Sequence, residues 1–284
     1  MGKLLKLTYY YNSGFSVQVG GTLLIFDYWE GEGRCLPPAY RLTPGFLQAF
    51  EQIFVFVSHA HPDHFDPVIY DWYKQGLPVT YIVSHDMPIG TRGKQMAPGK
   101  ELELTKDISV KAFDSTDLGV SFLVTVYGAT IFHAGDLNLW HWRQESTLKE
   151  IEEAEKAYYD AVAPLKNERI DIAMFPVDPR QGYMYDAGAN HFIMTEKPRV
   201  FIPMHWQDRP EVAIEYARRT RNNLTEVVAL TKPGTIANLT FNDNVLDILI
   251  IEPPKEMEDQ LRPLRRPGAP TSDPFTDTDL PVEL

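Results

Sequence analysis

The run His59-Ala60-His61-Pro62-Asp63-His64 carries the strongest chemical signal in this chain. It offers three imidazoles and one carboxylate, the donors that zinc and similar divalent ions take in catalytic sites. Alternate side chains of such a run can point to different sides of one loop and so serve two neighbouring ions. Four ordinary surface residues are the alternative, but so dense a pattern is rarely a chance match in a chain with eight histidines.

Two further candidate ligands stand at the ends of predicted strands. Asp136 follows the apolar residues Ile131 and Phe132, after a glycine that allows the backbone to turn, and His205 ends the predicted strand 200–204. Taken singly, an aspartate after a strand is usually a turn or cap residue, and a lone histidine is usually structural. Their order after the histidine run favours ligation.

With these three stretches in this order, the chain resembles the metallo-β-lactamase superfamily of metallo-hydrolases, and most of all its lactonase-like branch, which includes ascorbate-6-phosphate lactonases. The resemblance spans about 200 residues and implies a four-layer αββα sandwich of the α/β class, with the site at one edge between two sheets. It implies a first metal on His59 and His61, a second on Asp63, His64 and His205, and Asp136 as the bridge between them.

One departure from the family pattern concerns the third histidine that usually completes the first metal site. Ser115 stands roughly at its position, in a loop without any histidine. Four replacements stay open, namely Asp114, Asp117, His133 and His141, as does a weak first site that leaves one tightly held ion. Zinc is the expected metal, but a carboxylate in place of imidazole favours harder ions such as Mn²⁺ or Fe²⁺.

The elements that must position these residues can be traced in the apolar pattern. A hairpin is predicted from 15–19 and 22–26 around Gly20-Gly21, which supply the positive φ of a two-residue turn. The continuous apolar run 53–57 predicts a buried strand that ends directly before the histidine run. Further strands are predicted at 79–83, 120–127, 130–133, 170–177 and 200–204, and helices at 148–161, where Leu148 and Tyr158 share the apolar face, and at 212–221.

The chain divides by composition into a predicted metallo-hydrolase domain, 1–252, and a proline-rich acidic segment, 253–284. That segment contains seven prolines and little apolar periodicity, so we expect it to be extended or flexible, or else an arm on a partner subunit. The net charge of −12 argues against a nucleic-acid partner. No apolar run suits a signal segment or a membrane span, and a single cysteine, Cys35, fits a reducing compartment. We therefore expect a cytoplasmic protein.

The predicted function is hydrolysis of an ester, lactone, amide or phosphoester of a small molecule by metal-activated hydroxide, with Asp63 as the residue that orients the nucleophile and accepts its proton. His141, between Trp140 and Trp142, and His191 are the candidate substrate contacts; packing and backbone capping are their alternative roles. Arg180 could meet a substrate anion, whereas His85 is interpreted as structural.

Three other functions are weighed against the hydrolase. A di-iron oxidoreductase of this fold typically has a carboxylate where His61 stands and carries an electron-transfer module; the chain shows neither. A non-catalytic metal-binding or regulatory protein is suggested by the missing third histidine. A metallo-nuclease shares the histidine run, but the acidic balance and the lack of a basic insertion count against it. The oligomeric state, including a homo-oligomer, stays open.

Overall fold

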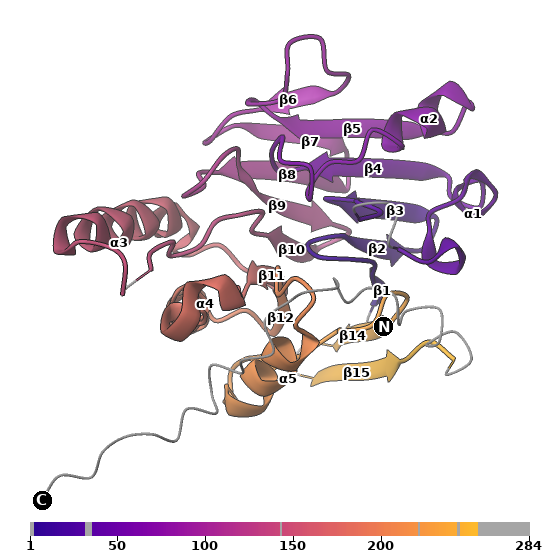
Figure 1. The fold of residues 1–284 in the computed structure, drawn as a ribbon. Helices are drawn as coiled ribbons and strands as arrows, with labels where there is room; N and C mark the ends of the chain where they lie inside the picture. Colours follow the sequence, from indigo (N-terminus) through magenta and orange to yellow (C-terminus); the bar gives the residue numbers. More distant parts are fainter. Residues whose placement is uncertain (1–2, 32–35, 143, 221, 243–244, 255–284) are drawn as a thin grey trace, which may run out of the picture.

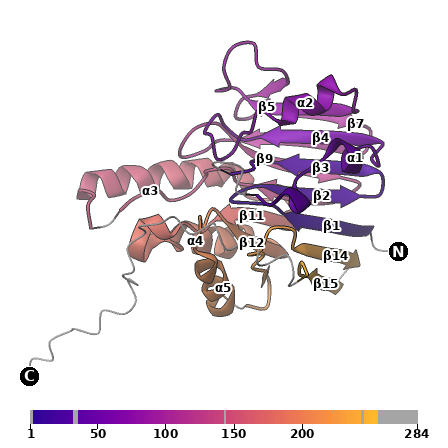
Figure 2. The same ribbon diagram turned by 45° about the vertical axis from the view of Figure 1, so that its right-hand side comes forward.

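Two β-sheets packed face to face, with helices over their outer faces, form the computed structural model (Figures 1 and 2). It describes residues 3–31, 36–142, 144–220, 222–242 and 245–254. The predicted four-layer α/β architecture is therefore confirmed. Cys35 and residues 255–284 of the predicted C-terminal segment lie outside the described residues, so the proposed boundary at 252 stays a prediction.

The first sheet has eight strands in the order β15-β14-β1-β2-β3-β4-β5-β6. In that order their bounds are Val245–Ile251, Ile236–Asn242, Lys3–Tyr9, Phe15–Val19, Thr22–Phe26, Gln52–Val57, Val79–Ser84 and Lys94–Met96. Strands β3, β4, β5 and β6 run parallel, whereas the neighbouring strands from β15 to β3 pair antiparallel.

The second sheet has seven strands in the order β13-β12-β11-β10-β9-β8-β7. In that order their bounds are Glu226–Val227, Val200–Met204, Ile172–Pro176, Ala129–His133, Ser121–Val126, Ile108–Phe113 and Glu101–Thr105. Strands β10 to β13 are parallel, so their carboxyl ends lie at the same edge.

Helices cover the outer face of each sheet. Helices α1, Pro44–Leu47, and α2, Ile69–Lys74, pack on the first sheet, and three helices pack on the second: α3, Leu148–Val162; α4, Ala187–Glu196; and α5, Pro210–Arg219. Short 3-10 turns lie at Pro38–Tyr40 (η2), Ala163–Leu165 (η3) and Pro179–Met184 (η4). No helix in the described residues is long and apolar enough to cross a membrane.

Alternation along the central strands explains why the apolar runs are continuous. On β4, Phe54 and Phe56 face the core between the sheets, whereas Ile53 and Val55 belong to the cluster under α1 and α2. Side chains on both faces of such a strand are removed from water, so both must be apolar. The loops that follow these strands therefore extend from a rigid base.

The predicted hairpin pairs Val19 with Thr22, and of its two glycines Gly20 alone has a positive φ, +58°. The prediction that Leu148 lies on the buried face of its helix is wrong: Leu148 opens α3 and is exposed, because this end of the helix projects beyond the sheet in both views (Figures 1 and 2).

Candidate metal centre

The candidate ligands meet at the edge where parallel strands of both sheets end. The loop 58–64 follows β4, and Asp27 follows its parallel neighbour β3. From the second sheet, Asp136, Asp178 and His205 follow β10, β11 and β12. Because carboxyl ends of parallel strands share an edge, segments far apart in the sequence deliver side chains to one place.

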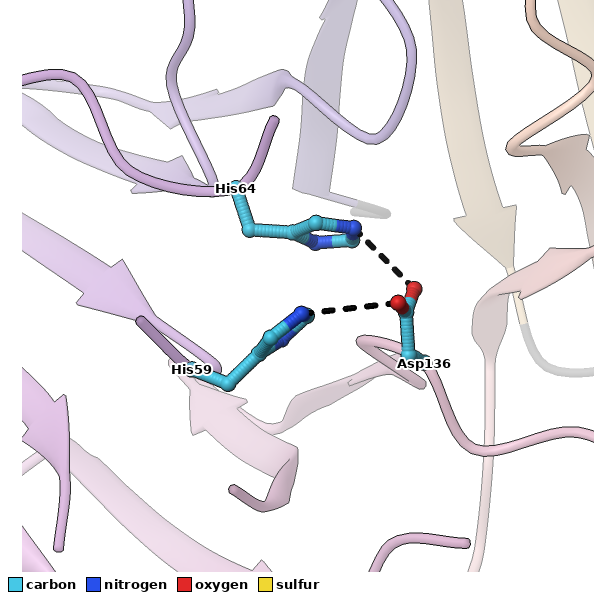
Figure 3. Close-up of side chains that lie close together, drawn as sticks. All are labelled: His59, His64 and Asp136. Atoms are coloured by element: carbon cyan, nitrogen blue, oxygen red, sulfur yellow. Dashed lines mark ion pairs between the residues drawn. The ribbon is translucent and has the colours of Figure 1, made fainter. Parts of the chain in front are cut away.

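Asp136 lies at the centre of this cluster, and Figure 3 shows its carboxylate facing both His59 and His64. Its Oδ1 lies 3.0 Å from His64 Nε2 and 3.3 Å from His205 Nε2, and its Oδ2 lies 3.4 Å from His59 Nε2. Each carboxylate oxygen therefore faces a different group of imidazoles. This is the arrangement that a carboxylate bridging two ions requires.

Three buried atoms of the cluster have no hydrogen-bond partner among the described residues: His64 Nε2, His205 Nε2 and Asp136 Oδ1. They point at one another, yet none of the contacts has hydrogen-bond geometry. A buried polar atom left without a partner costs about 1–3 kcal/mol, so three such atoms converging on one point need a common partner. Two imidazole nitrogens and a carboxylate oxygen suit a divalent ion.

Buried groups behind the imidazoles fix which nitrogen faces the cluster. His64 Nδ1 lies 2.7 Å from Asp27 Oδ2, and His205 Nδ1 lies 2.9 Å from Asp178 Oδ2. A carboxylate accepts a proton from Nδ1 and leaves the lone pair of Nε2 free for a metal. His59 Nδ1 is similarly placed 2.9 Å from the hydroxyl of Ser58.

Donor atoms of His59, His64 and Asp136 form one group within 4.8 Å of one another, and those of Asp63, His64 and His205 form a second. Asp63 Oδ2 lies 3.4 Å from His205 Nε2 and accepts a hydrogen bond of 3.1 Å from the Asn12 amide. Asn12 is buried in the loop between β1 and β2, and its backbone carbonyl accepts a long hydrogen bond of 3.5 Å from the backbone N–H of His205. Asn12 thus contacts both ligand stretches.

Asp117 lies beside His61, on the loop that lacks the expected third histidine. Its Oδ2 lies 3.8 Å from His61 Nδ1, and His61, Asp117 and Asp136 form a third group of donors within 4.8 Å. Of the other candidates, Asp114 accepts from the Ser115 backbone N–H, and His133 is held between the carbonyl of Ser13 and the N–H of Gly135. Asp117 is the candidate that the fold brings to His61.

Two glycines allow the loops of the two sheets to approach. A Cβ on Gly119, at φ +77°, would lie 2.0 Å from the carbonyl oxygen of Ser58 and 2.6 Å from the Cβ of His59. A Cβ on Gly135, at φ +55°, would lie 2.7 Å from the Cβ of Ser58. Only glycine avoids both the contact and the strain of the left-handed region.

Backbone strain gathers at the same site. Asn12, Asp27 and His205 have φ values of +50°, +41° and +61°, in the left-handed region that costs ordinary residues about 1–2 kcal/mol. Such strain persists where the surrounding structure imposes it, often at functional sites.

Charges within the cluster stabilise one another. Burial opposes ionisation of Asp136, but the positive charges of His64 and His205 hold its pKa well below the usual range. Burial opposes protonation of His205, but the charge of Asp136, the hydrogen bond to Asp178 and the nearby carboxylate of Asp63 raise its pKa to about 9. Burial likewise opposes ionisation of Asp63, whose pKa is nevertheless lowered by His205 and His64.

The predicted substrate contacts lie in different surroundings. His141 is buried, and neither of its ring nitrogens has a hydrogen-bond partner in the described part of the chain. His191, on α4, packs against Tyr158 and Tyr159 of α3, so its role as a substrate contact gains no support. Arg180 uses Nε and Nη2 to bind Asp178. Both histidine roles stay predictions.

Sequence reasoning misses Asp27, Asp178 and Asn12. The first two do carry a signal, since each follows a buried strand as Asp136 does. Asn12 carries none, because its contact with Asp63 depends on how β1 and β2 are connected.

Comparisons with known proteins find homologous sequences and similar folds, although no family model matches the chain. A UPF0173 metal-dependent hydrolase of Heliobacterium modesticaldum is 26% identical over 246 residues, 78% of this chain and 92% of that protein. Igni18, a novel metallo hydrolase from Ignicoccus hospitalis, has a TM-score of 0.61 at 19% identity, covering 84% of this chain and all of that one (100%). YhfI from Bacillus subtilis, a metallo-β-lactamase fold protein, has a TM-score of 0.54 at 14% identity, covering 83% and 99%.

None of these similarities bears on the lactonase-like branch, which stays a prediction. The chain has the metallo-β-lactamase fold and is a homologue of proteins named metal-dependent hydrolases.

Proposed function

We propose that this protein is a metal-dependent hydrolase that cleaves an ester, lactone, amide or phosphoester of a small molecule. The observation that carries the proposal is the convergence of three buried, unpartnered ligand atoms on one point, from His64, Asp136 and His205. The names of the homologues support it.

Two divalent ions fit the donor atoms. The first would be held by His59, His61, Asp117 and Asp136, and the second by Asp63, His64, Asp136 and His205. Each set offers two imidazoles and two carboxylates, donors that zinc accepts. Because Asp117 replaces a third imidazole in the first set, Mn²⁺ or Fe²⁺ is the alternative metal there. When bound, such ions lower the pKa of water and polarise the bond to be cleaved.

The residues at the open side of the cluster supply the remaining steps. The side chains of His61, Asp63 and Asp117 are 41%, 31% and 42% exposed, whereas Asp136 and the other imidazoles are buried. A substrate therefore approaches from the side of Asp63. Because the pKa of Asp63 is lowered, its carboxylate is ionised at neutral pH and can orient water. The same shift makes it a weak base, so its role as proton acceptor gains no support from this pKa.

The net charge of −12 disfavours nucleic acid as a substrate. A small substrate that is neutral, or whose negative charge the metal ions neutralise, fits this charge better. We propose a cytoplasmic location from the single cysteine. The proposal includes neither a nucleic acid nor a membrane as partner and leaves the oligomeric state open.

The test uses metal-free protein reconstituted with Zn²⁺, Mn²⁺ or Fe²⁺ and assayed on matched esters, lactones, amides and phosphodiesters. His205→Ala removes a ligand, and His85→Ala changes an exposed histidine outside the donor groups and serves as the control. We expect turnover that is lost on chelation and in His205→Ala but retained in His85→Ala. Tight metal binding without turnover of any substrate would favour the non-catalytic alternative, and salt-dependent cleavage of RNA would favour the nuclease.

A further inference from the structure

Two tryptophans extend from the metal centre towards solvent. Trp140 and Trp142 follow Asp136 on the same loop, and their rings are nearly parallel, 18° apart with centroids 6.4 Å apart. Trp140 also meets the His205 ring edge-on, with centroids 6.1 Å apart. The pair, called here the indole platform, therefore begins at a candidate ligand and ends at the surface.

Both indoles are fixed in orientation by their N–H groups. Trp140 Nε1 donates to the carbonyl of Asp136 over 2.7 Å, and Trp142 Nε1 donates to the carbonyl of Arg180 over 3.0 Å. These bonds tie the platform to the loops after β10 and β11, which also carry Asp136 and Asp178. With their donors occupied, the rings offer a visiting molecule mainly their apolar faces and edges.

Packing alone accounts for Trp140 but not for Trp142. Trp140 is partly buried beside His205, whereas Trp142 is 41% exposed although its ring is held rigidly. Scattered exposed apolar residues are ordinary, but a rigid indole stacked on a second one next to a chemical centre is a preformed binding surface. Holding it in place beforehand lowers the entropy cost of binding.

The geometry of the platform selects among ligand classes. Rings that recognise a quaternary cation usually enclose it with faces at steep angles to one another, whereas these two planes are nearly parallel. A flat aromatic ring can stack on such a surface and gain more than a saturated ring of the same size.

We propose that the indole platform binds a planar aromatic group of the substrate, so that the hydrolysable bond at the metal centre belongs to an aromatic ester, lactone, amide or phosphoester. The identity of this substrate class rests on the proposed function. The binding of aromatic rings does not, and it can be measured without turnover.

The test compares phenylacetate with cyclohexylacetate, which share a carboxylate and differ in the planarity of the ring. Calorimetric titration into the metal-loaded protein should show phenylacetate binding about three- to tenfold more tightly, the range expected for one aromatic pair. Trp142→Ala should abolish this preference, and Trp142→Phe should keep most of it. Phe46→Ala removes an aromatic side chain of similar exposure, 44%, on α1 and should change nothing.

Hydrolysis of the two methyl esters, followed by proton release, separates the two proposals. A preference for phenylacetate without turnover of either ester would support the platform and contradict an ester as the bond that this centre cleaves. Turnover of the methyl esters together with equal affinities for the two acids would support the hydrolase and contradict the platform. Equal or undetectable binding of both acids by the parent protein, or an unchanged preference in Trp142→Ala, would overturn the platform.

Discussion

Replacing Asp27 by Asn should weaken metal binding although Asp27 is not itself a ligand. Asp27 Oδ1 accepts from the backbone N–H of Ser58 over 2.7 Å, and Oδ2 accepts from the Ser58 hydroxyl over 2.5 Å and lies 2.7 Å from His64 Nδ1. Both oxygens thus face donors. An amide has a single oxygen, so its NH₂ group must meet one of these donors.

Either orientation of the amide is costly. If the NH₂ group faces His64, the imidazole must present Nδ1 as an acceptor, and its proton moves to Nε2, the atom needed for the metal. If it faces Ser58, two N–H donors meet, at a cost of about 1–3 kcal/mol in stability. Loss of such an outer partner typically weakens metal binding about 10- to 100-fold, which corresponds to about 1.4–2.8 kcal/mol.

Competition with a chromophoric chelator measures this change in metal affinity, and thermal unfolding monitors the fold. Asp171→Asn is the matched control, because Asp171 is also a buried carboxylate that accepts from a backbone N–H and a hydroxyl, both of Thr130. It precedes β11 and lies outside the donor groups. We expect Asp171→Asn to lower stability and leave metal affinity unchanged. Parental affinity in Asp27→Asn, or equal weakening in both variants, would refute the reasoning.

Three further predictions concern protons, Asn12 and the glycines. Because the pKa of His205 is raised to about 9, metal binding at neutral pH should release a proton from it, which calorimetry in buffers of different ionisation enthalpy detects. The positive charge of His205 also stabilises the metal-free protein, because its pKa is higher in the folded state than in the unfolded state. This stabilisation is complete below the unfolded pKa of about 6.5 and is lost as the pH rises through about 9, so the melting temperature of the metal-free protein should fall over that range. Asn12→Ala should lower kcat/KM on the order of tenfold, measured at saturating metal, by removing a hydrogen bond to the ionised Asp63; an unchanged rate would contradict this. Gly119→Ala should reduce metal content and stability, whereas Gly128→Ala, at φ +85° with open space around it, should lose only about 1–2 kcal/mol of stability; equal effects would show that the contact with Ser58 is unimportant.

The central strands could be predicted from sequence because burial on both faces leaves a continuous apolar run. The strand 200–204 matches β12, and the run 53–57 lies within β4. Other elements escape because their pattern is weak or short. Helix α4 buries the small residues Gly188 and Ala189 beside Phe192, which gives little apolar periodicity. In β1 the alternation of Leu5, Leu7 and Tyr9 is readable, although no strand is predicted there from the sequence.

The candidate ligands could be predicted because four of them are clustered in one short run. Asp136 and His205 needed the family's order of motifs as well, since strand-end aspartates are common. The roles of Asp27 and Asp178 could not be inferred in this way, because each depends on which imidazole of a neighbouring strand lies beside it in three dimensions. The choice of Asp117 over Asp114 likewise depends on the path of one loop.

The central claim is that imidazoles and carboxylates from both sheets hold divalent ions around Asp136. Anomalous diffraction from crystals of zinc-loaded protein, collected at the zinc absorption edge, tests it most directly. We predict two peaks flanking the Asp136 carboxylate, with bonds of about 2.0–2.2 Å, one to His59 and His61 and the other to His64 and His205. The absence of any peak between Asp136, His64 and His205 would contradict the account.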